Sequence, residues 1–505
     1  KRFTMKDKPL ILSLDQGTSS SRAVIFNCSG EIIASASSPL EINFPSDGWV
    51  EQDANNIWNS QLKAMELLEK KITPEQRGSV ISCGITNQRE TTILWRRSSS
   101  KPCAPALVWQ DRRTAGICQA WQKEGLEEQW CKSTGLVLDP YFSASKISWL
   151  LQNEEEAKTA LFEDDLCFGT VESWMLWQLS GGKQHLSDMS NASRTLLLDI
   201  ELLEWMEPYC EVIGLNKNSL PNLVPCQGDF GRIESHFPFG GVPIQALLGD
   251  QQAATLGQLC LDKGNSKCTY GTGAFLVVNT GQEIHRSKCG LLSTVGWTDK
   301  KGNPTYCLEG SLFNAGTVVQ WLRDNLQIIK SADQINTLAN EVENAAGVMF
   351  VPAFTGWGSP HWDPKARGIV LGITRDTQRG HLARAALEGI ALSVATLVKA
   401  AEKSLGQELK EIAVDGGAAA SNPLLEAQAN STGLPVRRPI NLESTARGAA
   451  LLAGFHCGGI DNIEDLIKER HKDSEVFMPN INEVEREKWL SKWNEAVQRS
   501  LGWHE

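Results

Sequence analysis

A carboxylate, a glycine, four hydroxyl groups and an arginine stand together in the segment DQGTSSSR, residues 15–22. Apolar runs on both sides of this segment predict two strands joined by a tight turn. Such a turn offers backbone N–H and O–H donors to an anion, and Arg22 adds a positive charge that suits phosphate. Asp15 fits beside a phosphate if a Mg²⁺ ion, held through water, lies between them. A polar hairpin turn without any ligand explains the same residues.

Two later turns have the same character. The segment YGTG at 270–273 supplies a glycine bend and a hydroxyl, and DGGA at 415–418 supplies a turn without bulky side chains. The Gly-Thr pairs at 17–18 and 271–272 are 254 residues apart, about half of the chain. One such turn is weak evidence, but three turns, each after a predicted strand, predict a nucleotide held between duplicated domains.

Two further sites carry groups that can bind or deprotonate a hydroxyl. Arg89 and Glu90 follow a predicted strand, and a guanidinium that donates beside a carboxylate that accepts can hold both faces of a hydroxyl. A solvated surface ion pair is the alternative for this pair. Asp250 stands between a predicted strand and a predicted helix, where it can act as a general base or cap the helix N-terminus.

Length and composition limit the class of protein. A chain of 505 residues predicts two or more domains, and 41% hydrophobic with 22% charged residues is typical of globular proteins. The net charge of −11 argues against a nucleic-acid partner. The thirteen cysteines form no C-x-x-C pair, which favours a reducing compartment. No apolar stretch is expected to approach the roughly 18 residues of a spanning helix. We therefore expect a cytoplasmic protein without stable membrane insertion.

The apolar patterns along the chain predict helices and strands that would position these groups. The N-terminal part predicts a strand meander over 10–14, 22–27 and 31–37, a helix over 54–71 capped by Asp53, a strand over 80–85, helices over 117–130 and 170–179, and a strand, turn and helix over 242–259. The C-terminal part predicts strand, turn, strand, turn and strand over 267–284, a strand and turn before a helix within 411–428, and helices over 381–405, 422–432, 444–455 and 483–501.

Taken in order, the motifs resemble those of the FGGY carbohydrate kinases, over nearly the whole chain. They include LDQGTSSSRAVIF, ITNQRETTILW, WQDRR, DPYFSASKISWLL, GDQQAATLGQL, YGTGAFL, VPAFTGWGSPHWDPKARG and VDGGAAASN. The resemblance implies an α/β protein with two duplicated actin/hexokinase/Hsp70-like (ribonuclease H-like) domains around a central cleft. It places the polyol and phosphate site in residues 1–254 and the nucleotide site in residues 255–505.

Within that family, the chain is most similar to the members that phosphorylate glycerol. The resemblance implies that seven residues contact the substrate: Arg89, Glu90, Trp109, Tyr141, Asp250, Gln251 and Phe275. Asp250 would be the general base. Plain core packing is the alternative for Trp109 and Phe275, since most aromatic side chains serve that purpose.

The same resemblance implies that ATP and Mg²⁺ take part. The implied nucleotide contacts are Thr18, Ser19, Ser20, Arg22, Thr272, Gly273, Gly316, Gln320, Gly417 and Ser421, and Asp15 is the implied metal residue. Ser421 departs from the family, which usually has Asn at this position. Its shorter hydroxyl is expected to lose a contact to adenine unless Asn422 replaces it.

The expected reaction is ATP-dependent phosphorylation of glycerol to sn-glycerol 3-phosphate, in glycerol uptake and catabolism, by a homo-oligomer (dimer or tetramer). A kinase of the same family that acts on a pentose, an aldonate or another polyol is one alternative. A nucleotide-driven switch or polymer former of the actin or Hsp70 type is another. The residues that resemble polyol contacts favour the first reading, since a switch needs none of them.

Overall fold

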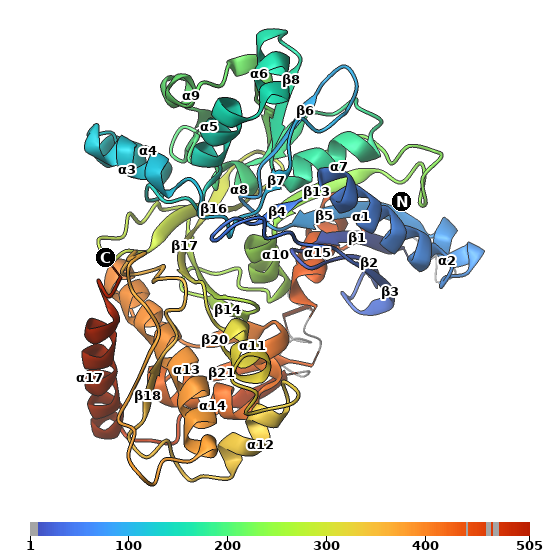
Figure 1. Cartoon of the computed structure of the whole chain (residues 1–505). Helices are drawn as coiled ribbons and strands as arrows, with labels where there is room; N and C mark the ends of the chain where they lie inside the picture. Colours follow the sequence, from blue (N-terminus) through green and yellow to red (C-terminus); the bar gives the residue numbers. More distant parts are fainter. Residues whose placement is uncertain (1–8, 441–442, 461–465, 468–473, 505) are drawn as a thin grey trace. The chain divides into compact units, whose positions relative to one another are not determined.

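The meander predicted at the N-terminus forms one side of a five-stranded sheet in the computed structural model (Figure 1). The strand order is β13-β5-β1-β2-β3. These strands are β1 (Leu10–Gln16), β2 (Ser20–Asn27), β3 (Ile32–Pro39), β5 (Val80–Asn87) and β13 (Ile244–Gly249). β2 is antiparallel to β1 and β3, whereas β5 is parallel to β1 and β13. The predicted strands are confirmed, and β1, β2 and β5 extend beyond the predicted ends by up to two residues.

The structure describes residues 9–440, 443–460, 466–467 and 474–504. The chain divides into two compact units. The first unit consists of Lys1–Leu259, Thr294–Tyr306 and Ser444–Ile467; the second consists of Cys260–Ser293, Cys307–Glu443 and Lys468–Glu505. Two later segments therefore belong to the first unit. The predicted division of tasks between residues 1–254 and 255–505 stays a prediction.

Helices cover the five-stranded sheet. α1 (Ala54–Glu69) packs on β2 and β3, and Asp53 caps it by accepting a hydrogen bond from the Asn55 backbone N–H at 2.7 Å, as predicted. α15 (Ser444–Cys457) packs on β1, β5 and β13, and also against α10 (Asp250–Gly257). All seven residues of β1 are buried, which is typical of a strand covered on both faces.

Glycines allow close packing around α15. A Cβ atom on Gly448 would lie 1.8 Å from the carbonyl oxygen of Ala253, and one on Gly257 would lie 1.9 Å from that of Ser444. A Cβ atom on Gly84 in β5 would lie 2.3 Å from the carbonyl oxygen of Ala449. Backbone therefore touches backbone where α10, α15 and β5 meet, and only glycine fits at these contacts.

The remaining elements of the first unit surround this sheet. They are β4 (Glu51–Gln52), α2 (Pro74–Gly78), β6 (Ile93–Arg96), β7 (Ala106–Leu107), α3 (Ala115–Lys123), α4 (Glu127–Thr134), α5 (Ser143–Asn153), α6 (Glu155–Phe162), β8 (Leu166–Gly169), α7 (Val171–Leu179), β9 (Leu186–Asp188), α8 (Met189–Ala192), β10 (Leu198–Asp199), β11 (Glu204–Trp205), α9 (Glu207–Ile213) and β12 (Asn222–Val224). The single helix predicted over 117–130 is wrong. Gly125 has a φ of 77° and separates α3 from α4, since this left-handed conformation ends a helix.

The second sheet repeats the topology of the first. Its order is β16-β17-β15-β14-β20-β21-β22. The strands are β14 (Ser266–Tyr270), β15 (Ala274–Gly281), β16 (Leu292–Thr298), β17 (Pro304–Leu312), β20 (Ile412–Asp415), β21 (Val436–Pro439) and β22 (Ser474–Phe477). β14 is antiparallel to β15 and parallel to β20, and β20 is parallel to β21. The order β21-β20-β14-β15-β17 thus matches β13-β5-β1-β2-β3, and the predicted duplication is confirmed. The third strand predicted before residue 284 is wrong, because the next strand after β15 begins at Leu292.

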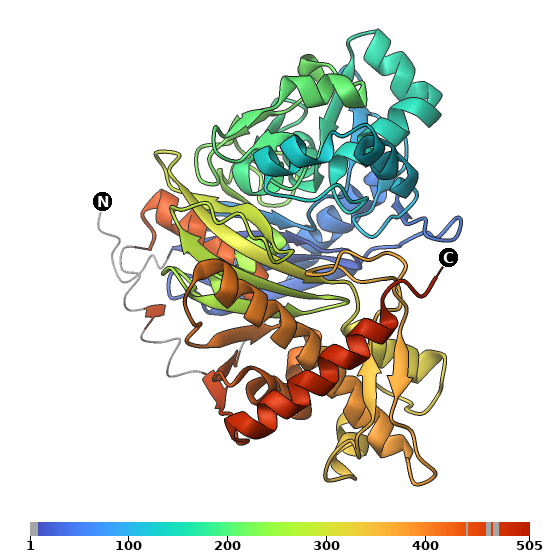
Figure 2. The same cartoon turned by 90° about the vertical axis from the view of Figure 1, so that its left-hand side faces the viewer.

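Helices predicted in the second half are present with nearly the predicted bounds. They include α13 (Arg379–Leu405), α14 (Asn422–Thr432) and α17 (Glu483–Ser500). The second unit also contains α11 (Gly316–Asp324), α12 (Gln334–Asn340), β18 (Met349–Val351) and β19 (Ile369–Leu371), for which no element was predicted. α17, red in Figure 2, packs against α14 and β18.

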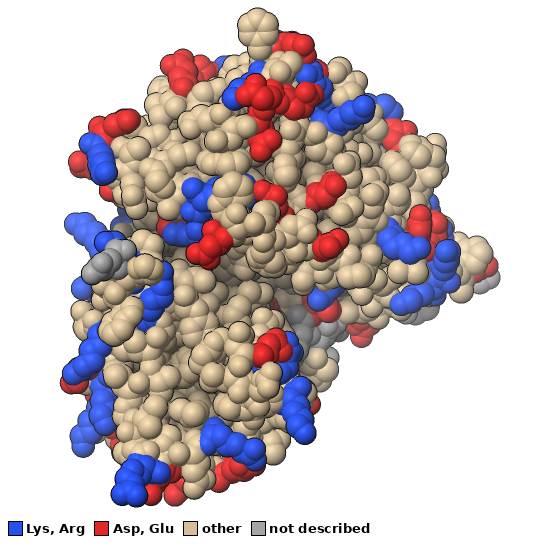
Figure 3. Space-filling model, viewed as in Figure 1, with Lys and Arg blue, Asp and Glu red and all other residues tan. Residues whose placement is uncertain are grey.

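α13 is long and apolar enough to cross a membrane by length and composition alone. The expectation that no stretch approaches this length was therefore wrong for α13, whose apolar character comes partly from many alanines. Since 72% of its apolar window is buried inside the structure, α13 has the surroundings of a core helix. On the face drawn in Figure 3, basic and acidic side chains are interspersed.

We predict that Gly448→Ala lowers the free energy of unfolding by about 2–3 kcal/mol, because the new methyl group would overlap the backbone of α10. Urea unfolding followed by circular dichroism would measure this loss. Gly116→Ala in α3 is the matched control, because a Cβ atom there has no neighbour within 4 Å. A Gly448→Ala protein as stable as the control would contradict the close packing of α10 on α15.

Candidate active site

Arg89 and Asp250 meet at one edge of the first sheet. The parallel strands β5 and β13 end at Asn87 and Gly249, so the residues that follow them lie at the same edge. Arg89 Nε lies 3.2 Å from Asp250 Oδ1, and its Nη1 donates a hydrogen bond to Gln252 Oε1 at 3.2 Å. The Arg89 side chain is 2% exposed and that of Asp250 is 29% exposed. A buried guanidinium therefore holds a carboxylate that solvent and a substrate can still reach.

Asp250 does not cap a helix. Gly249 occupies the N-cap position of α10, and Asp250 is the first helical residue. Its Oδ1 accepts a hydrogen bond from the backbone N–H of Gln251 at 2.7 Å. The capping alternative for Asp250 is therefore wrong. Gln251, also predicted at the site, is nearly buried, and its carbonyl oxygen accepts a hydrogen bond from the Thr255 hydroxyl at 2.8 Å.

Glu90 is buried next to Arg89, so the surface ion pair considered for these residues is wrong. Its Oε1 accepts a hydrogen bond from Arg194 Nε at 2.6 Å and lies 3.8 Å from Arg89 Nε. Glu90 has a φ of 60°, a strained left-handed conformation for a side chain of this size. Arg194 is fully buried, and its guanidinium lies over the ring of Tyr141 at 5.4 Å. No local sequence signal pointed to Arg194, because it lies about a hundred residues from Glu90 in the chain.

An aromatic pair connects this cluster to the N-terminal hairpin. Arg89 Nη2 donates a hydrogen bond to the Tyr141 hydroxyl at 3.3 Å, and the ring of Tyr141 lies edge-on to that of Trp109, with centroids 5.9 Å apart. Trp109 Nε1 donates a hydrogen bond to the Thr18 hydroxyl at 3.0 Å. Contacts thus run without a break from the turn at Thr18 to the carboxylate of Asp250. Trp109 is only half-buried, so core packing does not describe its surroundings.

The N-terminal hairpin is held from behind by glutamines. Gln88 donates to the carbonyl oxygen of Gly17 at 3.3 Å, and Gln52 donates to that of Thr18 at 2.6 Å. Ser19 is exposed at the tip, and Thr18 and Ser20 are partly exposed. The backbone carbonyls are thus engaged by protein donors, and the hydroxyl groups remain accessible to a ligand.

Asp15 and Arg22 face each other across the hairpin. They are directly paired in the register of β1 and β2, so their side chains lie on the same face. Asp15 is mostly buried and Arg22 partly so. Among the described residues, no three His, Cys, Asp or Glu side chains are grouped as metal ligands. A lone carboxylate suits Mg²⁺, which commonly keeps several waters and takes further ligands from phosphates.

Two buried carboxyl groups behind the site also escaped the sequence analysis. Glu172 accepts a hydrogen bond from Asn87 Nδ2, at the end of β5, at 3.3 Å. Asp188 accepts a hydrogen bond from the Ser190 backbone N–H at 2.9 Å, and the Ser190 hydroxyl in turn accepts one from the Gly249 N–H at 2.9 Å. Burial, followed by the nearby charge of Asp188, raises the pKa of Glu172 to about 7. This network ties down the ends of the two strands that carry Arg89 and Asp250.

Lys146 fixes the segment that carries Tyr141. Its buried ammonium group donates hydrogen bonds to the carbonyl oxygens of Pro140, Tyr141 and Phe142, at 2.7, 2.6 and 3.3 Å. Burial lowers the pKa of Lys146 to about 8. The motif SASKISWLL reads as an ordinary amphipathic helix, so the sequence carried no signal for this role.

The second unit contains the cavity that the predicted nucleotide residues form. Its volume is about 350 Å³, and five of those residues line it: Thr272, Gly316, Gln320, Gly417 and Ser421. The turn between β14 and β15 touches the start of α11, because the Gly316 N–H donates to the carbonyl oxygen of Gly271 at 2.9 Å. A Cβ atom on Gly316 would lie 2.6 Å from that oxygen, so this approach requires glycine.

The rest of this cavity is largely apolar. Val319, Ile335, Leu387, Ile390 and Leu424 contribute to its walls. A pocket of this size, with apolar walls and few polar groups, suits an aromatic base with its sugar. Gly273 lies next to Thr272, and a Cβ atom there would lie 2.2 Å from the carbonyl oxygen of Leu312. Phe275 lies in β15 of this second unit and is buried.

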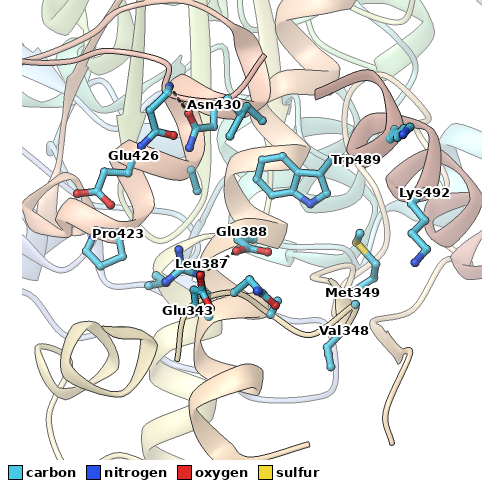
Figure 4. A pocket seen from close by; sticks show the side chains of 18 residues that line it. Glu343, Val348, Met349, Leu387, Glu388, Pro423, Glu426, Asn430, Trp489 and Lys492 are labelled. Atoms are coloured by element: carbon cyan, nitrogen blue, oxygen red, sulfur yellow. Dashed lines mark hydrogen bonds and ion pairs between the residues drawn. The ribbon is translucent and has the colours of Figure 1, made fainter. Parts of the chain in front are cut away.

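A larger cavity in the second unit contains none of the predicted site residues. Its volume is about 600 Å³, and Figure 4 shows Trp489 of α17 facing Glu388 of α13 across it. Arg384 Nε lies 3.1 Å from Glu388 Oε1, and burial raises the pKa of Glu388. Acidic and basic side chains both line this cavity, so its charge does not select one class of ligand.

We predict that Glu172→Gln changes how stability depends on pH. A carboxyl group whose folded pKa is raised stabilises the fold below its usual pKa of 4.5, and this contribution is lost as the pH rises through about 7. The wild-type protein should therefore lose stability between pH 5 and 8 relative to the variant, by on the order of 2 kcal/mol. Urea unfolding at each pH would measure the difference, with Glu128→Gln at an exposed position of α4 as the control. Parallel stability curves for the wild type and Glu172→Gln would contradict it.

Both halves of the chain match models of one family. The N-terminal domain of the FGGY family of carbohydrate kinases matches residues 10–257, and its C-terminal domain matches residues 266–457. A glycerol kinase from Thermus brockianus is 46% identical over 495 residues, covering 98% of this chain and 99% of that protein. A glycerol kinase from Halothermothrix orenii is 44% identical over 500 residues, covering 98% and 99%.

Solved structures share the whole fold. The crystal structure of a Plasmodium falciparum glycerol kinase with ADP has a TM-score of 0.89 and 34% identity, and covers 98% of each chain. A gluconate kinase from Lactobacillus acidophilus has a TM-score of 0.84 with 20% identity, covering 97% of this chain and 98% of that one, which shows the fold alone. The two-domain α/β fold and the family resemblance expected from the motifs are thus confirmed.

Proposed function

The chain belongs to the FGGY family of carbohydrate kinases, and we propose that it transfers the γ-phosphoryl group of ATP to glycerol, giving sn-glycerol 3-phosphate. The observation that carries the proposal is the continuous set of contacts from Thr18 through Trp109, Tyr141 and Arg89 to Asp250. It brings groups suited to phosphate and groups suited to a hydroxyl together in one unit. Relatives named glycerol kinase, similar over nearly the full length, support the choice of glycerol.

Glycerol has no charge, so the site must hold it through hydroxyl groups and carbon. Arg89 donates and Glu90 accepts, and the two together can bind adjacent hydroxyls. Their orientation is set before the substrate arrives, because Arg194, Gln252 and Tyr141 hold them. Trp109, and Phe275 from the second unit, would pack against the carbon atoms, and Gln251 would hydrogen-bond a hydroxyl.

Asp250 would act as the general base. As the glycerol oxygen bonds to the γ-phosphorus, its proton passes to Asp250, and the bond from the γ-phosphorus to the bridging oxygen breaks to release ADP. Arg89 orients Asp250, whose side chain remains partly exposed. A strong base is not needed, since phosphoryl transfer depends mainly on positioning and on stabilising charge.

The proposed nucleotide contacts fall into two groups of residues, one in each unit. Thr18, Ser19, Ser20 and Arg22 would contact the β- and γ-phosphates. Thr272 and Gly273 of the second unit are proposed as further nucleotide contacts, and the cavity lined by Gly316, Gln320, Gly417 and Ser421 would take the nucleoside. Asp15 would hold Mg²⁺ through water, and the ion would neutralise charge on the transferred phosphoryl group.

We predict that Asp250→Asn lowers kcat for glycerol by about 10²–10⁴, since the amide cannot accept the proton, and leaves the KM for ATP within a few-fold. Coupled measurement of ADP release with ATP and glycerol would show this. Asp47→Asn, at an exposed position, is the control and should keep wild-type kcat.

A panel of glycerol, pentoses, pentitols and aldonates tests the substrate. Preference for glycerol supports the proposal, and preference for a sugar or aldonate would assign the chain to another activity of the family. ADP release at the same rate with and without any polyol would indicate a nucleotide-driven switch instead.

We also propose a cytoplasmic homo-oligomer, a dimer or tetramer, without nucleic-acid partners or stable membrane insertion. The acidic net charge and the free cysteines of the described residues support these assignments. Light scattering after size-exclusion chromatography would give the mass, and a monomer would contradict the oligomer.

A further inference from the structure

Ser421 makes two contacts in the nucleoside cavity that the sequence does not show. Its hydroxyl accepts a hydrogen bond from the Leu424 backbone N–H at 3.3 Å, as the N-cap of α14. The same hydroxyl donates to Oδ1 of Asn336 at 2.5 Å. Asn336 belongs to α12 and lines the cavity. The single hydroxyl proton is thus committed to Asn336, because the N-cap contact uses the oxygen as an acceptor.

The neighbouring Asn422 has different surroundings. It is exposed, and its Oδ1 accepts a hydrogen bond from Arg438 Nη2 at 2.9 Å. It is not among the residues that line the cavity, whereas Asn336 and Ser421 both are. The sequence leaves open whether Asn422 replaces the amide usually found at position 421, and the place of Asn422 outside the cavity gives no support to that replacement. Asn336 supplies an amide at this place instead.

We propose that Asn336 forms hydrogen bonds with the edge of the adenine base and that Ser421 positions the amide group of Asn336. This inference rests on the proposed use of ATP. Apolar side chains such as Ile335, Ile390 and Leu424 would cover the faces of the base. A planar amide can pair with adenine through two hydrogen bonds, accepting from N6 and donating to N7. Oδ1 has two lone pairs, so it accepts from Ser421 and from adenine N6 together, and Nδ2 donates to N7.

This arrangement predicts discrimination by the group at position 6 of the purine. Inosine diphosphate carries an oxygen there in place of the amino group, and that oxygen would face Oδ1 of Asn336. In the structure, Oδ1 of Asn336 accepts from the Ser421 hydroxyl, and in this orientation the amide would present an acceptor to position 6 and Nδ2 to N7. Base selectivity would thus come from a residue of α12, 85 positions before Ser421 in the sequence.

The test measures the binding of ADP and of inosine diphosphate by calorimetry, without glycerol. Asn336→Ala should weaken ADP binding about tenfold and remove the preference for ADP. Asn336→Asp keeps the size of the side chain and should weaken the binding of both nucleotides, because a carboxylate cannot donate to N7. It should keep the preference for ADP, because the carboxylate still accepts from N6 and repels the oxygen of inosine diphosphate at position 6. Asn340→Ala is the matched control, an exposed asparagine on the same helix, and should bind both nucleotides as the wild type does.

Variants at Ser421 distinguish the positioning of the Asn336 amide group from the direct contact of that amide with the base. Ser421→Ala should weaken ADP binding about threefold, and its effect should not add to that of Asn336→Ala, since both act through one contact. Ser421→Asn in the Asn336→Ala background should restore ADP binding in part, because asparagine also caps helices and returns an amide to the cavity.

Two results would overturn the inference: a wild-type ratio of ADP to inosine diphosphate affinity in Asn336→Ala, or a loss of the preference for ADP in Asn336→Asp. Thermal unfolding of each variant identifies a general loss of structure. Wild-type protein that prefers ADP but does not phosphorylate glycerol would refute the proposed reaction while leaving the base contact supported.

Discussion

The buried guanidinium of Arg89 is the contact on which the candidate active site depends. It touches Asp250, Gln252 and Tyr141, and lies beside Glu90. A buried cation is costly unless its donors are occupied by acceptors, so the acceptors around Arg89 must stay in place as a set. The same requirement orients Asp250, and it holds Tyr141 next to Trp109. Substrate binding and proton acceptance therefore share one electrostatic centre.

The fold surrounds this centre with supports that do not touch substrate. Lys146 binds the carbonyls around Tyr141, and the network of Glu172 and Asp188 reaches Asn87 and Gly249. These buried charges bring a pH-dependent cost, as the raised pKa of Glu172 shows. Stability is thus reduced in order to hold the ends of β5 and β13 in one arrangement. Active sites commonly concentrate strain and perturbed ionisation in this way.

Much of this architecture could be predicted from the sequence, because its signals are local. Alternating and helical apolar patterns predicted the strands beside the glycine-rich turns and the longer helices such as α1 and α13, and glycine-rich turns after strands indicated the duplication that the two sheet orders confirm. The prediction of one helix over 117–130 was wrong because Gly125 adopts a left-handed conformation, which a helical apolar pattern does not reveal. The burial of Glu90, its pairing with Arg194 and the contact between Ser421 and Asn336 could not be predicted, since they join residues about 100 and 85 positions apart. Such pairs depend on tertiary structure and leave no periodic pattern.

The packing of α15, a late segment of the chain, on the first sheet affects how the protein can fold during synthesis. All five strands of this sheet come from residues before 250, yet the helix that covers β1, β5 and β13 begins at Ser444. During synthesis, the apolar face of that sheet therefore lacks α15 until nearly two hundred further residues have left the ribosome. Most of the second unit is synthesised within this interval, before the first unit has received α15. A fragment that stops after residue 257 would expose this face permanently, and aggregation would be its expected fate.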